Sequence, residues 1–211
     1  MNHSNFKLLA KKRELVLGSG SPRRLALLTD MGVEFTQTIP RLEEKQLSGE
    51  QPYVFAQRLA EAKARWVGKH MEQNQIVLSC DTIVILDGSV LGKPTDENEA
   101  FEILSTLAGK QHVVCTAVAL ATGDRFTGDR FTGDRFLVSD YETTEVYFND
   151  VTSDQIKEYI SSGEPMDKAG AYGIQGMGAF LVDRISGNLD NVIGLPRELL
   201  DELAKKVNRM L

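Results

Sequence analysis

A short turn of small residues joins an apolar run to a helical pattern near the start of the chain. The turn is Gly18-Ser19-Gly20-Ser21, the apolar run before it covers residues 15–17, and Pro22 opens the helical pattern after it. Strand, tight turn and helix in this order form the repeating unit of α/β proteins. The sequence therefore predicts a strand that leads through this turn directly into a helix.

The same turn indicates phosphate binding. Small residues let backbone N–H groups approach an anion, a helix N-terminus adds partial positive charge, and Arg23 and Arg24 add full charges. The alternative is an ordinary helix start, with Ser21 as the cap and Pro22 as the first helical residue. The turn is neither a P-loop nor a dinucleotide fingerprint, because Gly-Lys-Ser/Thr and Gly-x-Gly-x-x-Gly are both missing. The arginine pair favours the functional interpretation.

Hydrophobic periodicity predicts strands and helices in alternation through the first half of the chain, and mainly strands in the middle. The expected strands are 14–18, 34–39, 76–86, 90–91, 112–121, 137–148 and 180–185, and the expected helices are 22–31, 52–70, 96–108, 152–162 and one that starts at Pro196. Asp87-Gly88 predicts a hairpin turn. Since 211 residues suit one domain of ordinary size, we expect an α/β fold with a mixed sheet.

A five-residue sequence is repeated in the second half of the chain. Thr-Gly-Asp-Arg-Phe occurs three times in succession, at 122–126, 127–131 and 132–136. We interpret 122–136 as an expanded surface loop between two strands, because loops tolerate insertions. The alternative is a functional basic and aromatic arm, but each unit carries one Asp and one Arg and so adds no net charge.

The overall charge limits the classes of partner. A formal net charge of −6 argues against general binding to nucleic acid polymers or to anionic membranes. No apolar run reaches the roughly 18 residues of a membrane span, and residues 1–14 lack the apolar core of a secretory signal. Cys80 and Cys115 each lie in an apolar run and are expected to be reduced core residues. We therefore expect a cytoplasmic protein that binds phosphate through a local cation cluster or a divalent metal.

One acidic residue interrupts the most apolar expected strand. Asp81 lies in the middle of the run 77–85. A charge in such a place lowers stability unless it is paired or binds a metal. We interpret Asp81 as a catalytic or metal-binding carboxylate at the lip of the sheet. The alternative is an edge strand on which Asp81 faces water.

Two further segments favour contact with a nucleotide. Lys93, on the stiff turn Gly92-Lys93-Pro94, could reach a phosphate as a point charge. Four glycines between 170 and 178 indicate a backbone that lies close to another group. There, Gln175 could bind the edge of a base and Tyr172 could stack or pack; the alternative is an ordinary glycine-rich turn.

Glu44 and Lys63 are candidates only in combination. Glu44 lies in a loop of mixed charge, and Lys63 lies near the apolar face of the expected helix 52–70. Either side chain alone would ordinarily be solvated. His112 has no obvious nucleophile partner in the sequence, so we propose no Ser-His-Asp triad.

Taken together, these segments resemble the Maf family of nucleoside triphosphate pyrophosphatases over about residues 14–205. The matching pieces, in the order of the family, are Ser19-Gly20-Ser21-Pro22-Arg23-Arg24, Asp81-Thr82, Gly92-Lys93-Pro94, Ala108-Gly109-Lys110-Gln111-His112, Asp167-Lys168-Ala169-Gly170-Ala171-Tyr172-Gly173-Ile174-Gln175 and Gly194-Leu195-Pro196. Each piece alone is weak, and the six in order are specific.

The resemblance implies an elongated α/β fold like that of the inosine-triphosphatase type, with a mixed sheet flanked by helices and a central cleft. It implies a single domain over residues 1–211, a homodimer, and Mg²⁺ or Mn²⁺ as the cofactor. The implied reaction hydrolyses a nucleoside triphosphate to the monophosphate and pyrophosphate. The segment 167–175 resembles the branch of the family that acts on dTTP and UTP.

The resemblance also implies the site residues. The family's functional positions fall on Ser19, Arg23, Glu44, Lys63, Asp81, Lys93, Lys168 and Gln175. From the charges, we expect Asp81, Lys63, Lys93 and Arg23 to be catalytic, Ser19, Arg24, Lys168 and Gln175 to bind the substrate, and Glu44 and Asp81 to bind the metal. Asp81 could act as the general base or as a metal ligand, and both assignments stay open.

Some residues depart from the family's pattern. Gly18 and Cys80 stand where the family usually has alanine, and we expect little effect because all these residues are small. The segment 188–191 replaces a more usual aromatic-containing turn, and the repeat 122–136 is not a family feature. A nucleotide-binding regulator of cell division or septum formation is the alternative function. A sugar-nucleotide or dinucleotide-binding domain is disfavoured because the fingerprint is missing.

Overall fold

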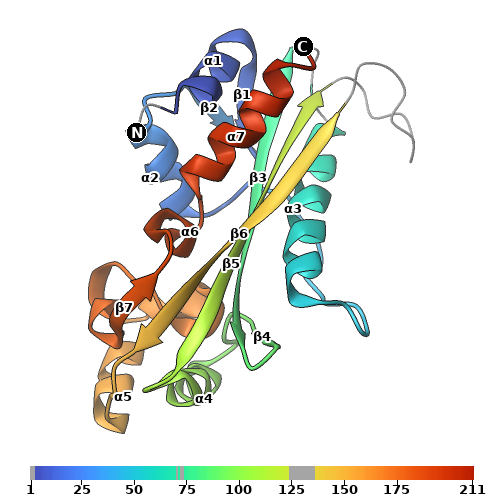
Figure 1. The fold of residues 1–211 in the computed structure, drawn as a ribbon. Coiled ribbons are helices and arrows are strands. Elements are labelled where there is room, and N and C mark those ends of the chain that lie inside the picture. The colour runs from blue at the N-terminus through green and yellow to red at the C-terminus, as the bar shows by residue number, and fades with distance from the viewer. Residues whose placement is uncertain (1–2, 70, 72–73, 124–135) are drawn as a thin grey trace. The chain divides into compact units, whose positions relative to one another are not determined.

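The computed structural model describes residues 3–69, 71, 74–123 and 136–211 (Figure 1). The helices are α1 (Ser4–Lys12), α2 (Pro22–Asp30), α3 (Pro52–Gly68), α4 (Glu97–Leu107), α5 (Ser153–Ser161), α6 (Leu189–Ile193) and α7 (Arg197–Asn208), with short 3-10 helices η1 (Glu164–Asp167), η2 (Ala169–Ala171) and η3 (Gly176–Leu181). The strands are β1 (Glu14–Leu17), β2 (Phe35–Gln37), β3 (Gln75–Leu86), β4 (Ser89–Leu91), β5 (Gln111–Gly123), β6 (Leu137–Phe148) and β7 (Val182–Ser186). The interpretation of the repeat 122–136 as a loop falls almost entirely outside the described residues.

The strands form one mixed sheet of seven strands in the order β2-β1-β3-β5-β6-β7, with β4 paired to β3. β1 runs parallel to β2 and to β3, whereas β4 is antiparallel to β3 and β7 is antiparallel to β6. Helices flank this sheet, which confirms the predicted α/β class. Asp87 and Gly88 both have positive φ, of 50° and 79°, as a tight hairpin turn requires.

The position of β3 decides between the two interpretations of Asp81. β3 lies between β1 and β5, so it is an interior strand of the sheet. The Asp81 residue is only 5% exposed. The alternative of an edge strand with Asp81 facing water is therefore wrong.

The chain divides into two compact units, which we describe separately. The first unit comprises residues 1–81, 116–142 and 194–211, and the second comprises 82–115 and 143–193. β3, β5 and β6 contribute residues to both units. The single domain expected over residues 1–211 stays a prediction, as do the elongation and the cleft that the resemblance implies.

In the first unit, α1 and α7 lie side by side (Figure 1). Phe6 and Leu9 of α1 are fully buried. The Asp201 carboxylate on α7 accepts hydrogen bonds from the Asn5 side chain at 2.7 Å and from the Phe6 backbone N–H at 2.9 Å. The second of these bonds satisfies a backbone N–H in the first turn of α1, where a helix leaves such groups without intrahelical partners.

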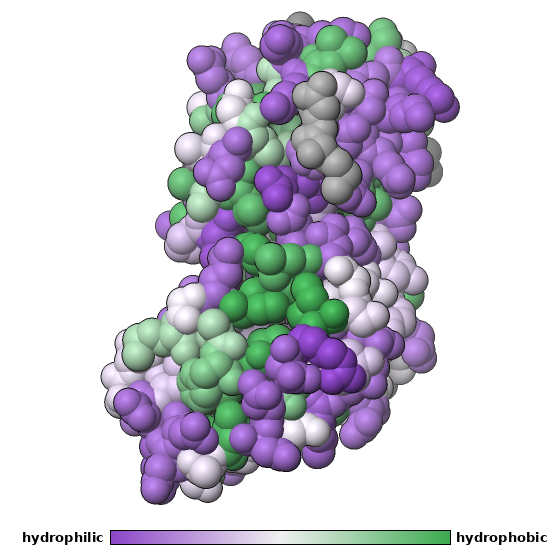
Figure 2. All heavy atoms as spheres, turned by 60° about the vertical axis from the view of Figure 1, so that its left-hand side comes forward, coloured by the Kyte–Doolittle hydropathy of each residue, from purple (hydrophilic) through white to green (hydrophobic). Residues whose placement is uncertain are grey.

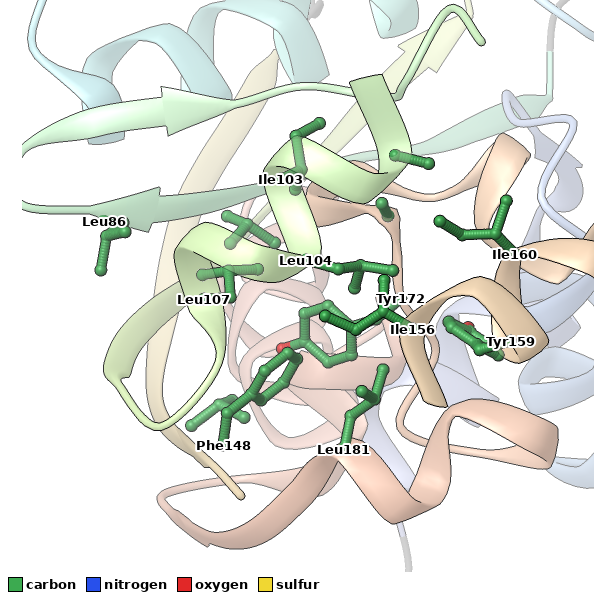
Figure 3. Packing of buried hydrophobic residues seen from close by; sticks show 14 of the residues in the cluster. Leu86, Ile103, Leu104, Leu107, Phe148, Ile156, Tyr159, Ile160, Tyr172 and Leu181 are labelled. Carbon is green, nitrogen blue, oxygen red and sulfur yellow. The ribbon is translucent and has the colours of Figure 1, made fainter. Parts of the chain in front are cut away.

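In the second unit, a hydrophobic core forms around α4 and α5. Figure 3 shows the Tyr172 side chain among Leu104, Leu107, Ile156 and Phe148. The rings of Phe148 and Tyr172 meet edge to face with centroids 4.7 Å apart, a favoured geometry for aromatic pairs. This core supports the glycine-rich segment that follows η1.

One face of the molecule is mainly hydrophilic. Figure 2 shows that hydrophilic side chains predominate on this face around one hydrophobic area. Across the described ranges of the chain, no helix is both long enough and apolar enough to cross a bilayer. Cys80 and Cys115 are both buried thiols outside any disulfide, as predicted.

Candidate functional site

The turn between β1 and α2 is held by hydrogen bonds to Ser19. The Ser19 Oγ accepts a hydrogen bond from Arg24 Nη1 at 2.9 Å and from the Ser21 N–H at 3.2 Å. The Gln37 side chain on β2 donates to the Ser19 carbonyl at 2.8 Å. Ser21 occupies the N-cap position of α2 and Pro22 begins the helix, as the alternative interpretation expects, but the Ser21 side chain makes no capping hydrogen bond.

The two arginines that follow the turn differ in their surroundings. Arg24 is buried, and its Nε donates to the Gly194 carbonyl at 2.8 Å, which ties the turn to the residues before α7. Arg23 is half-buried. Arg24 therefore organises the turn, and Arg23 is the better placed of the two to meet an anion from solvent.

A buried lysine joins two carboxylates in the same unit. Lys63 lies on α3 and its Nζ is 2.5 Å from Asp81 Oδ1 on β3 and 2.7 Å from Glu44 Oε1 in the loop before α3. The expected combination of Glu44 with Lys63 is thus present in the structure. One ammonium group between two carboxylates leaves the trio with a net negative charge, which suits a cation more than an anion.

Burial shifts the ionisation of Asp81 and of its neighbour Cys80. Burial raises the pKa of the Asp81 carboxyl above its ordinary value, while the nearby charges of Lys63 and Arg24 lower it in part and Glu44 raises it further. Burial also raises the pKa of the neighbouring Cys80 thiol to about 11. Cys80 therefore stays a protonated thiol at neutral pH, which excludes it as a nucleophile.

The donors at the trio fit a divalent cation only in part. Over the residues that the structure describes, no group of three or more His, Cys, Asp or Glu side chains could hold a metal ion. Glu44 and Asp81 supply two carboxylates, each now paired with Lys63. Mg²⁺ typically binds through one or two carboxylates and completes its shell with water and substrate phosphates. The trio therefore fits such an ion when a phosphate is present.

The second unit brings the segments of Lys93 and Lys168 together. The Gly170 N–H donates to the Gly92 carbonyl at 2.9 Å, which joins the turn of Lys93 to the segment that starts at Lys168. Gly170 has a φ of 68°, and a Cβ there would lie 2.8 Å from a Val84 methyl group. The prediction that a glycine in this segment lies against another group is confirmed, and at Gly170 that group is a side chain of the protein.

Glu164 organises the rest of this segment. Its carboxylate accepts hydrogen bonds from the Tyr159 hydroxyl at 3.0 Å, the Met177 N–H at 3.0 Å and the Gly178 N–H at 3.3 Å. Lys168 Nζ donates to the Glu164 carbonyl at 2.5 Å and to Asp167 at 2.6 Å. Glu164 was not predicted from sequence, since an acidic residue beside a proline in a glycine-rich segment is typical of any exposed loop.

Gln175 and Tyr172 are both candidates for contact with the base of a nucleotide, but one is exposed and the other is buried. Gln175 is exposed, and within the described parts of the chain its side chain makes no hydrogen bond, so it can bind a ligand. Tyr172 lies in the core, where its hydroxyl is 2.8 Å from His112 Nε2. Tyr172 is therefore a packing residue, and the interpretation of its ring as one that stacks on a base is wrong.

Comparisons with known proteins place the chain among relatives of one family. The family model described as "Maf-like protein" matches residues 14–207. A Syntrophomonas wolfei protein named dTTP/UTP pyrophosphatase is 44% identical over 180 residues, which cover 85% of this chain and 90% of that protein. Proteins of the same name from Symbiobacterium thermophilum and Dictyoglomus thermophilum are 45% and 40% identical, over 87% and 95% of this chain and 89% and 99% of their own lengths. A solved HAM1 protein from Coxiella burnetii aligns with a TM-score of 0.47 at 17% identity, over 92% of this chain and 99% of that chain.

Proposed function

Because this chain belongs to the Maf family, we propose that it hydrolyses nucleoside triphosphates, above all dTTP and UTP, to the nucleoside monophosphate and pyrophosphate. The observation that carries this proposal is the buried Asp81 carboxylate, which lies 2.5 Å from Lys63 on an interior strand. A buried charge lowers stability unless it is compensated, and a positioned carboxylate can serve hydrolysis as a general base or a metal ligand.

We assign the triphosphate to the cations that the sequence analysis identified. In the first unit, Arg23 adds positive charge for the phosphates, and Ser19 and Arg24 shape the turn after β1 that binds phosphate oxygens. Lys63 assists catalysis by countering the charges of Glu44 and Asp81, which lowers their repulsion of the substrate. Lys93 and Lys168 are the corresponding cations of the second unit. Concentrating cations in this way allows a chain with a net charge of −6 to bind a strongly anionic substrate.

In the reaction, water attacks the α-phosphorus. A bond forms from the water oxygen to that phosphorus, and the bond from the phosphorus to the bridging oxygen breaks, so that pyrophosphate leaves with the electron pair. Asp81 either accepts the proton of the water as general base or holds a metal that orients it. Glu44 and Asp81 would hold a Mg²⁺ or Mn²⁺ ion, which when bound would neutralise charge on the phosphates.

Base selection falls to the segment that Glu164 organises. The exposed amide of Gln175 carries both a donor and an acceptor, and the edge of a pyrimidine presents both as well. Replacing Gln175 with Ala should therefore change the preference among bases more than the rate of the chemical step.

The broader properties follow from the family and the composition. We propose a cytoplasmic homodimer whose chain acts as a single catalytic domain over residues 1–211 and does not bind nucleic acid polymers. The net charge of −6 supports the last point, since polyanions repel an acidic protein.

The test is a panel of nucleoside triphosphates assayed with Mg²⁺ and with Mn²⁺, in which pyrophosphate and orthophosphate are measured separately. We expect pyrophosphate mainly from dTTP and UTP. Pyrophosphate from other bases alone would contradict the role of Gln175 and leave the chemistry intact. A folded protein that binds nucleotides and releases no product from any of them would contradict the proposed hydrolysis and favour a binding protein.

A further inference from the structure

Glu44 reaches Lys63 from a segment that has almost no regular structure. Residues 38–51, which lead from β2 into α3, contain neither helix nor strand. Ordering such a segment costs conformational entropy, so its position must be fixed by specific contacts. The position of Glu44 therefore depends on residues outside the trio of Glu44, Lys63 and Asp81.

We propose that Arg58 and Glu50 form a clamp that holds this segment against α3 and thereby positions the Glu44 carboxylate at Lys63. The clamp is a positioning device for the reaction and rests on the proposed function. Neither residue belongs to the motifs that indicate the site from sequence.

The contact between the two residues is bidentate. Arg58 Nε lies 2.5 Å from Glu50 Oε1, and Arg58 Nη2 lies 2.8 Å from Glu50 Oε2. The Glu50 side chain is only 7% exposed. Paired, shielded contacts of a guanidinium with a carboxylate fix orientation as well as distance, which a single ion pair on the surface does not.

The clamp holds the backbone at the residue next to Glu44. Arg58 Nη2 also donates to the Lys45 carbonyl at 2.9 Å. Glu50 completes the link, because its carboxylate accepts from the Leu47 N–H at 3.0 Å and its carbonyl accepts from the Gln46 side chain at 2.8 Å. Arg58 thus ties the segment to α3 at two residues, Lys45 and Glu50, and Glu50 ties the residues between them.

The same helix supplies both ends of this arrangement. Arg58 and Lys63 lie on α3, so fixing the segment to Arg58 also fixes it relative to Lys63. The Arg58 hydrogen bonds lower the pKa of the Glu50 carboxyl to about 2, so the clamp stays ionised at any pH near neutrality. Arg58 Nε and Nη2 are both used within the clamp, which favours a positioning role over contact with the substrate.

The test compares Arg58→Lys, which keeps the charge and loses the planar fork, with Arg65→Lys as the matched control. Arg65 lies on the same helix and pairs with Glu61 at 3.5 Å, away from the clamp. Two readouts on the full chain are independent. One is kcat and KM for dTTP, and the other is the rate of tryptic cleavage after Arg41 and Lys45, both exposed residues of the segment.

For Arg58→Lys we expect kcat to fall about tenfold or more, with KM changed little and cleavage after Lys45 accelerated. Arg65→Lys should leave both readouts unchanged. The decisive comparison repeats Arg58→Lys in a Glu44→Gln background, where it should lower kcat no further because both changes disable the same group.

Three results would overturn the clamp: unchanged cleavage in Arg58→Lys, unchanged kcat in Arg58→Lys, or an equal further fall in the Glu44→Gln background. Failure of the proposed function is distinguishable, because it would appear as no pyrophosphate from the unmodified protein. The cleavage rates would in that case still test whether Arg58 holds the segment.

Discussion

The Nζ of Lys63 lies 2.5 Å from Oδ1 of Asp81, and the two side chains are 10% and 7% exposed. A buried pair of this kind is weak as a source of stability, but removing one partner leaves the other charge buried without compensation. The two members are not equivalent here, since Lys63 has Glu44 as a second carboxylate 2.7 Å away. Replacing Lys63 therefore leaves two carboxylates without their ammonium partner, whereas replacing Asp81 leaves Lys63 paired with Glu44.

Replacing Lys63 with Met should destabilise the protein by about 3 kcal/mol at pH 7, because the buried Asp81 carboxylate then has no ammonium partner. The pKa of the Asp81 carboxyl, which burial already raises, should rise further when the ammonium group is removed. Protonation removes the uncompensated charge, so the destabilisation should shrink as the pH falls. Urea unfolding of Lys63→Met and of the unmodified protein at pH 7 and pH 5 measures this, and an equal loss at both pH values would contradict it.

Arg24 and Arg23 should respond differently to replacement by Lys. Arg24→Lys loses two fixed hydrogen bonds, to Ser19 and to Gly194, and should lower the free energy of unfolding by about 1–3 kcal/mol. Arg23→Lys should change stability little and raise KM for the nucleotide. Thermal unfolding and steady-state kinetics of both variants test the difference, which would be refuted if Arg23 proved the more important for stability.

Gly18 should not tolerate alanine, contrary to the expectation from residue size. A Cβ on Gly18 would lie 2.3 Å from Ser79 Oγ and 3.2 Å from a Val67 methyl group. We expect Gly18→Ala to cost about 1–3 kcal/mol of stability. In the described structure, Ser79 Oγ is buried and has no hydrogen-bond partner, so Ser79→Ala should restore much of the loss. Urea midpoints of both single variants and the double variant measure this coupling, and additive effects would show that the two residues do not clash.

His112 should make the protein less stable in mild acid. Burial lowers the pKa of its imidazole from the ordinary 6.5 to about 4. Between these values the unfolded chain binds the proton and the folded chain does not, so the free energy of unfolding falls as the pH falls from 6.5 to 4. The full loss is about 3 kcal/mol, and it is absent above pH 6.5.

The matched variant is His112→Gln, which does not titrate and can still hydrogen-bond to the Tyr172 hydroxyl. The difference in stability between pH 7 and pH 4.5 should be smaller in this variant than in the unmodified protein. Equal differences would mean that another group causes the acid sensitivity.

Much of the fold follows from local sequence patterns. The β-branched run 76–86 and the Asp87-Gly88 turn indicate β3 and its hairpin because strand formation and tight turns depend on adjacent residues. α1 was not predicted, since it is short and polar with only two buried residues, Phe6 and Leu9, and it packs against α7, which is far away in the sequence. A helix that depends on a distant segment gives only a weak local signal.

The candidate site, like the fold, can be predicted from local sequence only in part. Asp81 is conspicuous because a charge breaks an apolar run, so its importance is visible in the sequence. Glu50, Arg58 and Glu164 are ordinary surface residue types, and only the folded chain brings Arg58 to Glu50 and backbone N–H groups to Glu164. Tyr172 was ambiguous for the same reason, since an aromatic residue among glycines can pack or stack until its neighbours are known.

The central claim is that water attacks the α-phosphorus with the help of Asp81, and hydrolysis of dTTP in ¹⁸O-labelled water tests it most directly. We predict that the label appears in the phosphate of the nucleoside monophosphate and not in pyrophosphate. Asp81→Asn should slow this reaction by about 10²-fold to 10⁴-fold, while its far-UV circular dichroism stays that of the unmodified protein. Label in pyrophosphate or orthophosphate, or full activity of Asp81→Asn, would contradict the account.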